Sequence, residues 1–176
     1  MAGDASNIRV WETGDVFIFD PAETYDPATD VPANIDAALG ADWLPAGLMM
    51  GTPGVGMARS IERTDVMSWQ QGRVKERVKN PKVDITFTLL EDNAVTDDLV
   101  DDAAVPSVKY RYVALVFTED ETGVVKRYIS KAKVGLFVAT NNIEQDINGR
   151  EITGSLEPVA GEYWTIQEGV PAGGEA

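Results

Sequence analysis

The chain has 176 residues and a formal net charge of −14, with 15 basic and 29 acidic residues, and it contains neither cysteine nor histidine. These absences exclude disulfide bridges, thiol nucleophiles, histidine general bases and metal sites built on either residue. The length suits one domain. The sequence contains no apolar run of about 18 residues, the length that a membrane-spanning helix needs. We therefore expect a structural or binding protein made in a reducing cytosol, with no catalytic residue, no cofactor and no metal.

Charge is segregated into blocks along the chain. From Met1 to Gly56 the single basic residue is Arg9, set against nine acidic residues. From Met57 to Lys82 the sign reverses, with seven basic residues, and residues 91–102 are acidic again. An acidic protein repels phosphate, so we expect no nucleic-acid binding. The blocks allow two interpretations, which are simple solubility and surfaces of opposite sign that meet between copies of the chain.

The N-terminal third combines a short strand region with a long connection. The N-terminus has neither a basic n-region nor an apolar h-region, so we expect no signal peptide. Residues 8–20 predict two short strands kinked at Gly14, or one strand with a bulge there. Residues 21–42 form an acidic connection with three prolines, and so long a loop is usually functional. Residues 35–39 could form one helical turn within it.

The next segment is apolar from Trp43 to Met50 and is followed by a glycine-rich turn at residues 51–56. The glycine spacing matches neither a dinucleotide-binding motif nor a phosphate-binding loop, so we interpret it as a turn that needs backbone freedom. Residues 57–63 and 65–71 predict two short strands.

The clearest element lies within residues 73–93, whose second half alternates between apolar and polar side chains. Period-two alternation is typical of a half-buried β-strand, and its expected buried face consists of Val83, Ile85, Phe87 and Leu89. A helix is predicted from Asn93 to Ala103, capped by Asn93 or Thr96. Its acidic residues lack the order and central glycine of a calcium-binding loop, so we interpret them as a solvated face.

The C-terminal half is rich in predicted strands. Residues 108–119 and 124–130 predict a hairpin around the turn at residues 120–123. Residues 133–140 and 144–158 predict a second antiparallel pair, joined at Asn141 and Asn142. Many short strands with hairpin turns and one helix predict a mostly β fold, an antiparallel sandwich or barrel with one short helix at about 94–103 and long loops.

We expect a single domain over residues 1–176, with three peripheral segments. These are an N-terminal arm at about 1–20, the long acidic loop at about 21–42 and a flexible C-terminal tail at about 167–176.

The order of these pieces resembles the major tail (tube) protein of long-tailed bacteriophages, especially those infecting actinobacteria. The similar segments are Val10 to Phe17 before the acidic loop, Trp43 to Gly47, the basic stretch after Trp69, and the strand Asp84 to Asn93 leading into a helix. The resemblance covers about residues 7–160. It departs at residues 44–51, where a different glycine-rich segment is usual, so that loop is expected to be built differently.

This resemblance implies a β-sandwich subunit that forms hexameric rings, stacked into a hollow tail tube through which DNA passes during ejection. The implied partners are further copies of the chain, the tape-measure protein, the tail terminator and the baseplate or distal tail proteins. The implied location is the virion, after synthesis in the host cytoplasm. Strand pairing between subunits would cover open sheet edges, and an acidic wall would repel DNA.

Candidate interface residues are aromatic side chains, which concentrate at binding hot spots, and side chains of the basic block, which could dock on an acidic surface. They are Trp11, Phe17, Phe19, Trp69, Arg73, Lys75 and Arg77. For Trp11 and Trp69, core packing remains an equal interpretation. Other functions stay open: the tube protein of a contractile injection or type VI-like secretion system, a carboxylate-based hydrolase, and a monomeric β-barrel ligand binder.

Overall fold

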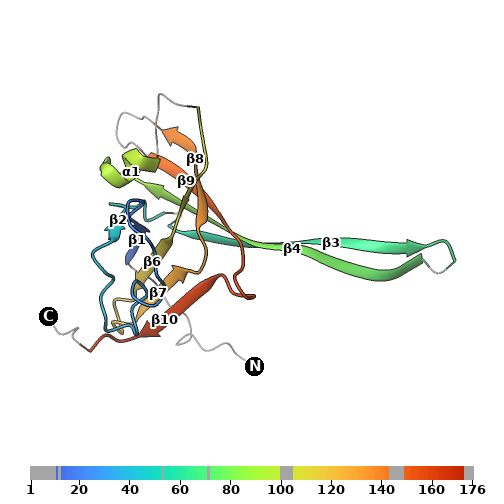
Figure 1. Ribbon diagram of the computed structural model, residues 1–176, viewed down its shortest axis with the longest axis horizontal. Coiled ribbons are helices and arrows are strands. Elements are labelled where there is room, and N and C mark those ends of the chain that lie inside the picture. Colours follow the sequence, from blue (N-terminus) through green and yellow to red (C-terminus); the bar gives the residue numbers. More distant parts are fainter. Residues whose placement is uncertain are drawn as a thin grey trace.

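The computed structural model describes residues 11, 13–52, 54–70, 72–99, 105–142 and 149–172. Two antiparallel sheets face each other beside one short helix, and a long hairpin projects from them (Figure 1). The elements in chain order are β1 Thr13–Phe19, β2 Trp43–Pro45, β3 Gly56–Ser68, β4 Gly72–Leu89, α1 Ala94–Leu99, β5 Lys109–Arg111, β6 Val113–Thr118, β7 Val125–Ser130, β8 Val134–Asn142, β9 Gly149–Leu156 and β10 Trp164–Gly169. The predicted mostly β fold with one short helix is confirmed.

Each sheet has five strands in the described part of the chain. The first has the order β10-β7-β6-β1-β2, and the second has the order β3-β4-β9-β8-β5. Every strand pair is antiparallel. The two sheets have separate edge strands, so the fold is a sandwich and not a closed barrel.

The core lies between the two sheets. The predicted buried face of β4 is confirmed, because Val83, Ile85, Phe87 and Leu89 are at most 3% exposed. Their partners across the sandwich are Val16, Ile18, Val113 and Leu115. The interior is filled with side chains, as in other close-packed domains.

A second apolar cluster covers the outer face of the first sheet. Phe19, Trp43, Ala114 and Ile129 form its buried part, and Tyr25, Val31 and Leu39 from the long loop pack on them. Residues 21–42 therefore fold over the sheet. This explains the continuous apolar run at residues 16–19, because a strand covered on both faces needs no polar side chains.

Residues 46–50 cross from the first sheet to the second. The Ala46 N–H donates to the Val16 carbonyl at 2.8 Å, whereas the Met50 N–H donates to the Thr88 carbonyl at 2.9 Å. Helix α1 follows β4, and the Asn93 side-chain oxygen caps it by accepting the Val95 and Thr96 N–H groups at 2.9 and 3.0 Å. Residues 100–103 of the predicted helix lie outside the described residues.

Two predictions about the N-terminal third are corrected. Strand β1 runs through Gly14 without a kink and pairs with β6 in continuous register. The glycine is explained by a close approach, since a Cβ there would lie 3.1 Å from the Phe117 ring. Residues 35–39 form a turn and not a helical turn, because the Asn34 side chain accepts the Asp36 and Ala37 N–H groups.

Four strand boundaries also differ from the predictions. The two strands predicted at 57–63 and 65–71 are the single strand β3, whereas the strand predicted at 108–119 breaks at Tyr112 and contributes to both sheets. Asn141 and Asn142 extend β8 and pair with β9, so they are not the turn. Residues 167–169 lie in β10, paired with β7, and not in a flexible tail.

Candidate assembly surface

Strands β3 and β4 continue as a two-stranded ribbon beyond the sandwich (Figure 1). Strand β9 pairs with β4 only as far as Val83, so residues 60–82 have no third strand beside them. We call residues 60–82 the arm. None of its described residues is buried. At about 3.3 Å per residue, the arm is roughly 35 Å long.

A β-bulge lies at the base of the arm. The register shifts between Ser60 and Glu62, which leaves Asn80 and Pro81 opposite Ile61. Asn80 has φ +49°, a left-handed conformation that asparagine tolerates better than most residues. Its side-chain amide donates to the Glu62 carboxylate at 2.8 Å. Because bulges bend the strand and increase its twist, this feature fixes the direction in which the arm leaves the sandwich.

One face of the arm is neutralised internally. Directly paired residues share a face of an antiparallel ribbon, so Arg63 lies beside Val78, and Asp65 lies beside Glu76. Arg63 pairs with Glu76 at 3.5 Å. Arg73 pairs with Asp65 at 2.9 Å and also with Glu76. The two cations on this face therefore already have carboxylate partners in the same ribbon.

The opposite face keeps an excess of positive charge. Lys75, Arg77 and Lys79 alternate along β4, and their cross-strand partners are Val66, Thr64 and Glu62. Among the described residues, these three cations have no carboxylate within ion-pair distance. We call Lys75, Arg77 and Lys79 the basic face. An opposing acidic surface would find these charges available for pairing.

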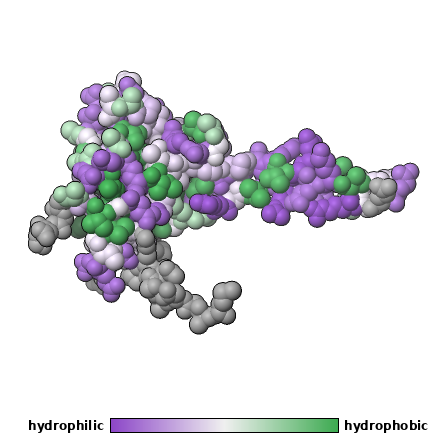
Figure 2. All heavy atoms as spheres, turned by 90° about the horizontal axis from the view of Figure 1, so that it is seen from below, coloured by the Kyte–Doolittle hydropathy of each residue, from purple (hydrophilic) through white to green (hydrophobic). Residues whose placement is uncertain are grey.

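The arm also exposes apolar side chains, which interrupt its hydrophilic surface (Figure 2). Trp69, in the turn at its tip, is fully exposed. The other large apolar side chains exposed on the arm are Ile61, Val66, Met67, Val74 and Val78. Such side chains on an unsupported ribbon indicate a surface that is covered in an assembly.

The structure brings four of the seven sequence-predicted interface residues onto the arm: Trp69, Arg73, Lys75 and Arg77. The prediction for Arg73 needs refinement, because this residue is engaged within its own ribbon. Lys79 was not among the predicted residues. Its period-two spacing from Lys75 and Arg77 is a signal that could have identified it.

The other three predicted interface residues belong to the sandwich. Phe19 is 3% exposed and packs edge-on against Tyr25 and Trp43, so its prediction as an interface residue is wrong. Phe17 is partly buried against the same cluster. Trp11 is partly exposed and lies tilted against the Phe117 ring, with 6.2 Å between ring centroids.

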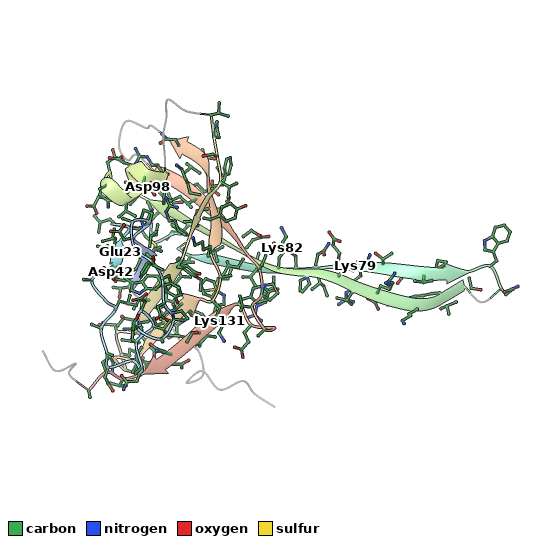
Figure 3. All side chains as sticks on the ribbon, in the orientation of Figure 1. Glu23, Asp42, Lys79, Lys82, Asp98 and Lys131 are labelled. Carbon is green, nitrogen blue, oxygen red and sulfur yellow. The ribbon has the colours of Figure 1, made fainter. Side chains whose placement is uncertain are left out.

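The acidic loop is held in a defined shape. Asp20 and Asp26 accept N–H groups two residues ahead, and the Asp36 carboxylate accepts the Ala172 N–H at 2.7 Å. Arg127 donates to the Ala37 carbonyl at 3.0 Å, and burial lowers the pKa of this guanidinium. Figure 3 shows Glu23 and Asp42 on the sandwich and Lys79 out on the arm, so acidic loop and basic face do not meet within one copy.

A hollow of about 570 Å³ lies at the base of the arm. Its lining is largely apolar and includes three methionines, and Asp15 is the acidic residue in it. The large apolar side chains that line it include Trp11, Leu48, Met49, Met50, Met57 and Phe117.

A second hollow of about 300 Å³ contains two carboxyl groups, Asp20 and Glu23, beside Tyr25 and Tyr112. A carboxylate-based hydrolase, one of the alternatives left open by the sequence, would need such a pair. The Asp20 carboxylate, however, already accepts the Ala22 N–H at 2.8 Å. The two rings stack with 3.8 Å between centroids. Loop folding therefore accounts for this arrangement.

None of the described helices is long and apolar enough to cross a membrane. Within the described residues, no three acidic, cysteine or histidine side chains are grouped so as to hold a metal ion.

Two solved structures are similar to this chain, both with TM-scores below 0.5. One is the sheath-tube complex of an extracellular contractile injection system, PVC, in the extended state, with 13% identity, a TM-score of 0.43, and coverage of 82% of this chain and 99% of that chain. The other is the tube-terminating cap of the anti-feeding prophage, with 14% identity, a TM-score of 0.39, and coverage of 85% and 98%. At this level the likeness concerns the fold alone. No protein-family model and no curated protein matches the chain.

Proposed function

We propose that this chain is a structural subunit that assembles with copies of itself into a tail tube. The arm is the observation that carries the proposal. A two-stranded ribbon is marginally stable in water without a third strand or a packed face. This one exposes apolar side chains and uncompensated cations along roughly 35 Å. A neighbouring subunit would cover both.

The neighbour's sandwich is the complementary surface. The arm contains six basic and three acidic residues, which leaves nine basic and 26 acidic residues in the rest of the chain. The basic face therefore meets a sandwich of opposite charge in any other copy. Electrostatic complementarity of this kind steers association and fixes orientation.

The outer face of the second sheet is the candidate wall of the channel. The first sheet's outer face is covered by the loop at 21–42, whereas the second sheet pairs polar residues across its strands. These outer residues include Asp84, Thr86, Thr88, Glu151, Thr153 and Ser155. These side chains are hydroxyls and carboxylates, and the neighbouring Lys82 is paired with Asp84 at 3.0 Å, so such a wall would have little attraction for DNA.

The particular assembly that we propose is the tube of a long-tailed phage, with hexameric rings and a location in the virion. The tape-measure protein, tail terminator and distal tail proteins would be its partners. The alternative is the inner tube of a contractile injection or type VI-like system. A sheath protein in the same particle distinguishes the two.

Charge reversal of the basic face tests the proposal. The triple variant Lys75→Glu, Arg77→Glu, Lys79→Glu should remain a folded monomer and fail to form rings or tubes. Negative-stain electron microscopy and light scattering at increasing concentration measure this. A matched control, Lys75→Arg, Arg77→Lys, Lys79→Arg, keeps the charge and should assemble normally. Six-fold tubes formed equally by the reversed variant would refute the arm as the contact.

A further inference from the structure

Two features of the described residues match each other in size and chemistry, an exposed tryptophan and an open hollow. Trp69 is fully exposed at the tip of the arm. The hollow at the base of the arm is lined by Met49, Met50, Met57 and Phe117, and by Trp11, whose ring centroid lies 6.2 Å from that of Phe117. Tryptophan is the residue most enriched at energetically dominant contact sites, and methionines adapt their shape to aromatic guests.

The hollow is accessible to a guest of this size. Leu48 at its edge is 70% exposed, and Met57 is 37% exposed. A volume of about 570 Å³ exceeds what one indole ring occupies, and an aromatic side chain buries roughly 150–250 Å² on docking. Thioether sulfur next to an aromatic ring adds a favourable contact.

The arm's own tip cannot occupy the hollow. Met57 lies at the start of β3, on the sandwich side of the arm, and the ribbon extends away from it (Figure 1). Trp69 can therefore reach such a hollow only in another molecule. Charge complementarity favours a second copy of the chain as the source of the occupant. The arm carries an excess of cations, whereas the hollow contains Asp15 and lies on an acidic sandwich.

We propose that Trp69 of one copy inserts into the hollow at the base of the arm in the next copy. This inference rests on the proposed function and specifies the contact that builds the assembly. Tip and hollow are different surfaces of one chain, so the contact is head-to-tail. Such contacts close into rings or continue as filaments. Successive copies would then be offset by about one arm length, roughly 35 Å.

Cysteine cross-linking tests the contact, because the natural chain has no cysteine. Gln70→Cys places a thiol beside Trp69 and keeps the indole, and Leu48→Cys places one at the edge of the hollow. When the two single variants are mixed under mild oxidation, a disulfide-linked heterodimer is expected. The matched control replaces Leu48→Cys by Val108→Cys, an exposed position just before β5, the edge strand of the second sheet.

The expected yield with Leu48→Cys is at least about tenfold that with Val108→Cys, as for a contact at an interface hot spot. Adding Trp69→Ala to the Gln70→Cys chain should reduce the yield about tenfold, and Trp69→Phe should restore most of it. Equal yields at positions 48 and 108, or no effect of Trp69→Ala, would overturn the inference.

The charge-reversal experiment separates this inference from the proposed function. If wild-type tubes form and are lost on reversal of the basic face, but no preferential cross-link reaches position 48, the tube stands and the hollow is not the docking site. If neither tubes nor preferential cross-links form, both proposals are wrong.

Discussion

Gly154 occupies a position in β9 where its neighbours in the second sheet leave no room for a side chain. It lies opposite Ile85 on one neighbouring strand and Leu136 on the other. A Cβ at this position would lie 2.7 Å from Val134 and 2.9 Å from both Ile85 and Leu136. Because these side chains are themselves fully packed, Gly154→Ala should lower the free energy of unfolding by about 1–3 kcal/mol. Urea denaturation measures the loss.

Gly56 provides the matched control for that substitution. It also lies in a strand paired with β4, but a Cβ there would meet its nearest heavy atoms at 3.8 and 3.9 Å. Gly56→Ala should change the free energy of unfolding by less than about 0.5 kcal/mol. If both variants lose the same stability, overpacking is not the cause at Gly154, because a Cβ at Gly56 meets no close contact.

Tyr25 makes stability depend on pH in the alkaline range. Burial raises the pKa of its hydroxyl from 10.0 to about 12, and Tyr112 and Asp30 add to the shift. A raised folded pKa means that the native state holds its proton more tightly than the unfolded chain. This contribution is present below pH 10 and is lost as pH rises from 10 to about 12. Unfolding followed across this range should show the loss, and Tyr25→Phe should reduce it. A variant with the same alkaline slope as the wild type would exclude Tyr25 as the cause.

The burial of single residues could be predicted where apolar and polar side chains alternate along a strand, but not where both faces of a strand are covered. Val83 and Ile85 alternate with polar residues, so one face was identified as buried. Phe17 and Phe19 lie in a strand that does not alternate, because the distant loop at 21–42 covers the outer face of this strand. No local sequence signal reports that cover, and Phe19 was therefore expected at an interface.

Among the elements, the arm is the one that the sequence described least well. Alternation reports burial, and the arm has no buried face in the described residues, so residues 57–71 were predicted as two short strands. The bulge at Asn80 and Pro81 also breaks the apparent pattern of β4. The composition nevertheless marked the segment as a candidate interface, because its charge sign and its tryptophan differ from the flanking sequence.

Removing the arm should separate folding from assembly. Ser60 and Lys82 are directly paired, so a two-residue Asn-Gly turn can replace residues 61–81. The free energy of unfolding should change by less than about 1 kcal/mol, because none of the described arm residues is buried. The shortened chain should stay monomeric. Size-exclusion chromatography with light scattering, together with urea denaturation, measures both properties.

Shortening a different hairpin provides the control for removal of the arm. Replacing residues 120–123, in the β6–β7 hairpin, by a two-residue turn should leave assembly intact, because these residues belong neither to the arm nor to the lining of the hollow. If the arm-less chain unfolds, the ribbon contributes to the fold of the monomer. If it folds and still forms tubes, the arm is dispensable for assembly.

For the whole molecule, the sequence predicted the sandwich and the segregation of charge, but not how the charge is distributed in space. The blocks at 1–56 and 57–82 suggested docking between an acidic loop and a basic segment. The structure separates the two within one copy and divides the basic segment into a neutralised face and a basic face. That division depends on strand register, which a one-residue shift would reverse.

This distribution predicts how assembly depends on salt. Wild-type assembly has two opposing electrostatic contributions, attraction of the basic face to an acidic sandwich and repulsion between sandwiches. The variant Lys75→Gln, Arg77→Gln, Lys79→Gln keeps only the repulsion. The ratio of the critical assembly concentration of this variant to that of the wild type therefore measures the attraction. The ratio should be large at low salt and approach one near 1 M, because the Debye length falls from about 10 Å at 0.1 M to about 3 Å. Sedimentation of assembled material measures both concentrations. A salt-independent ratio would mean that the three side chains act through packing and not through charge.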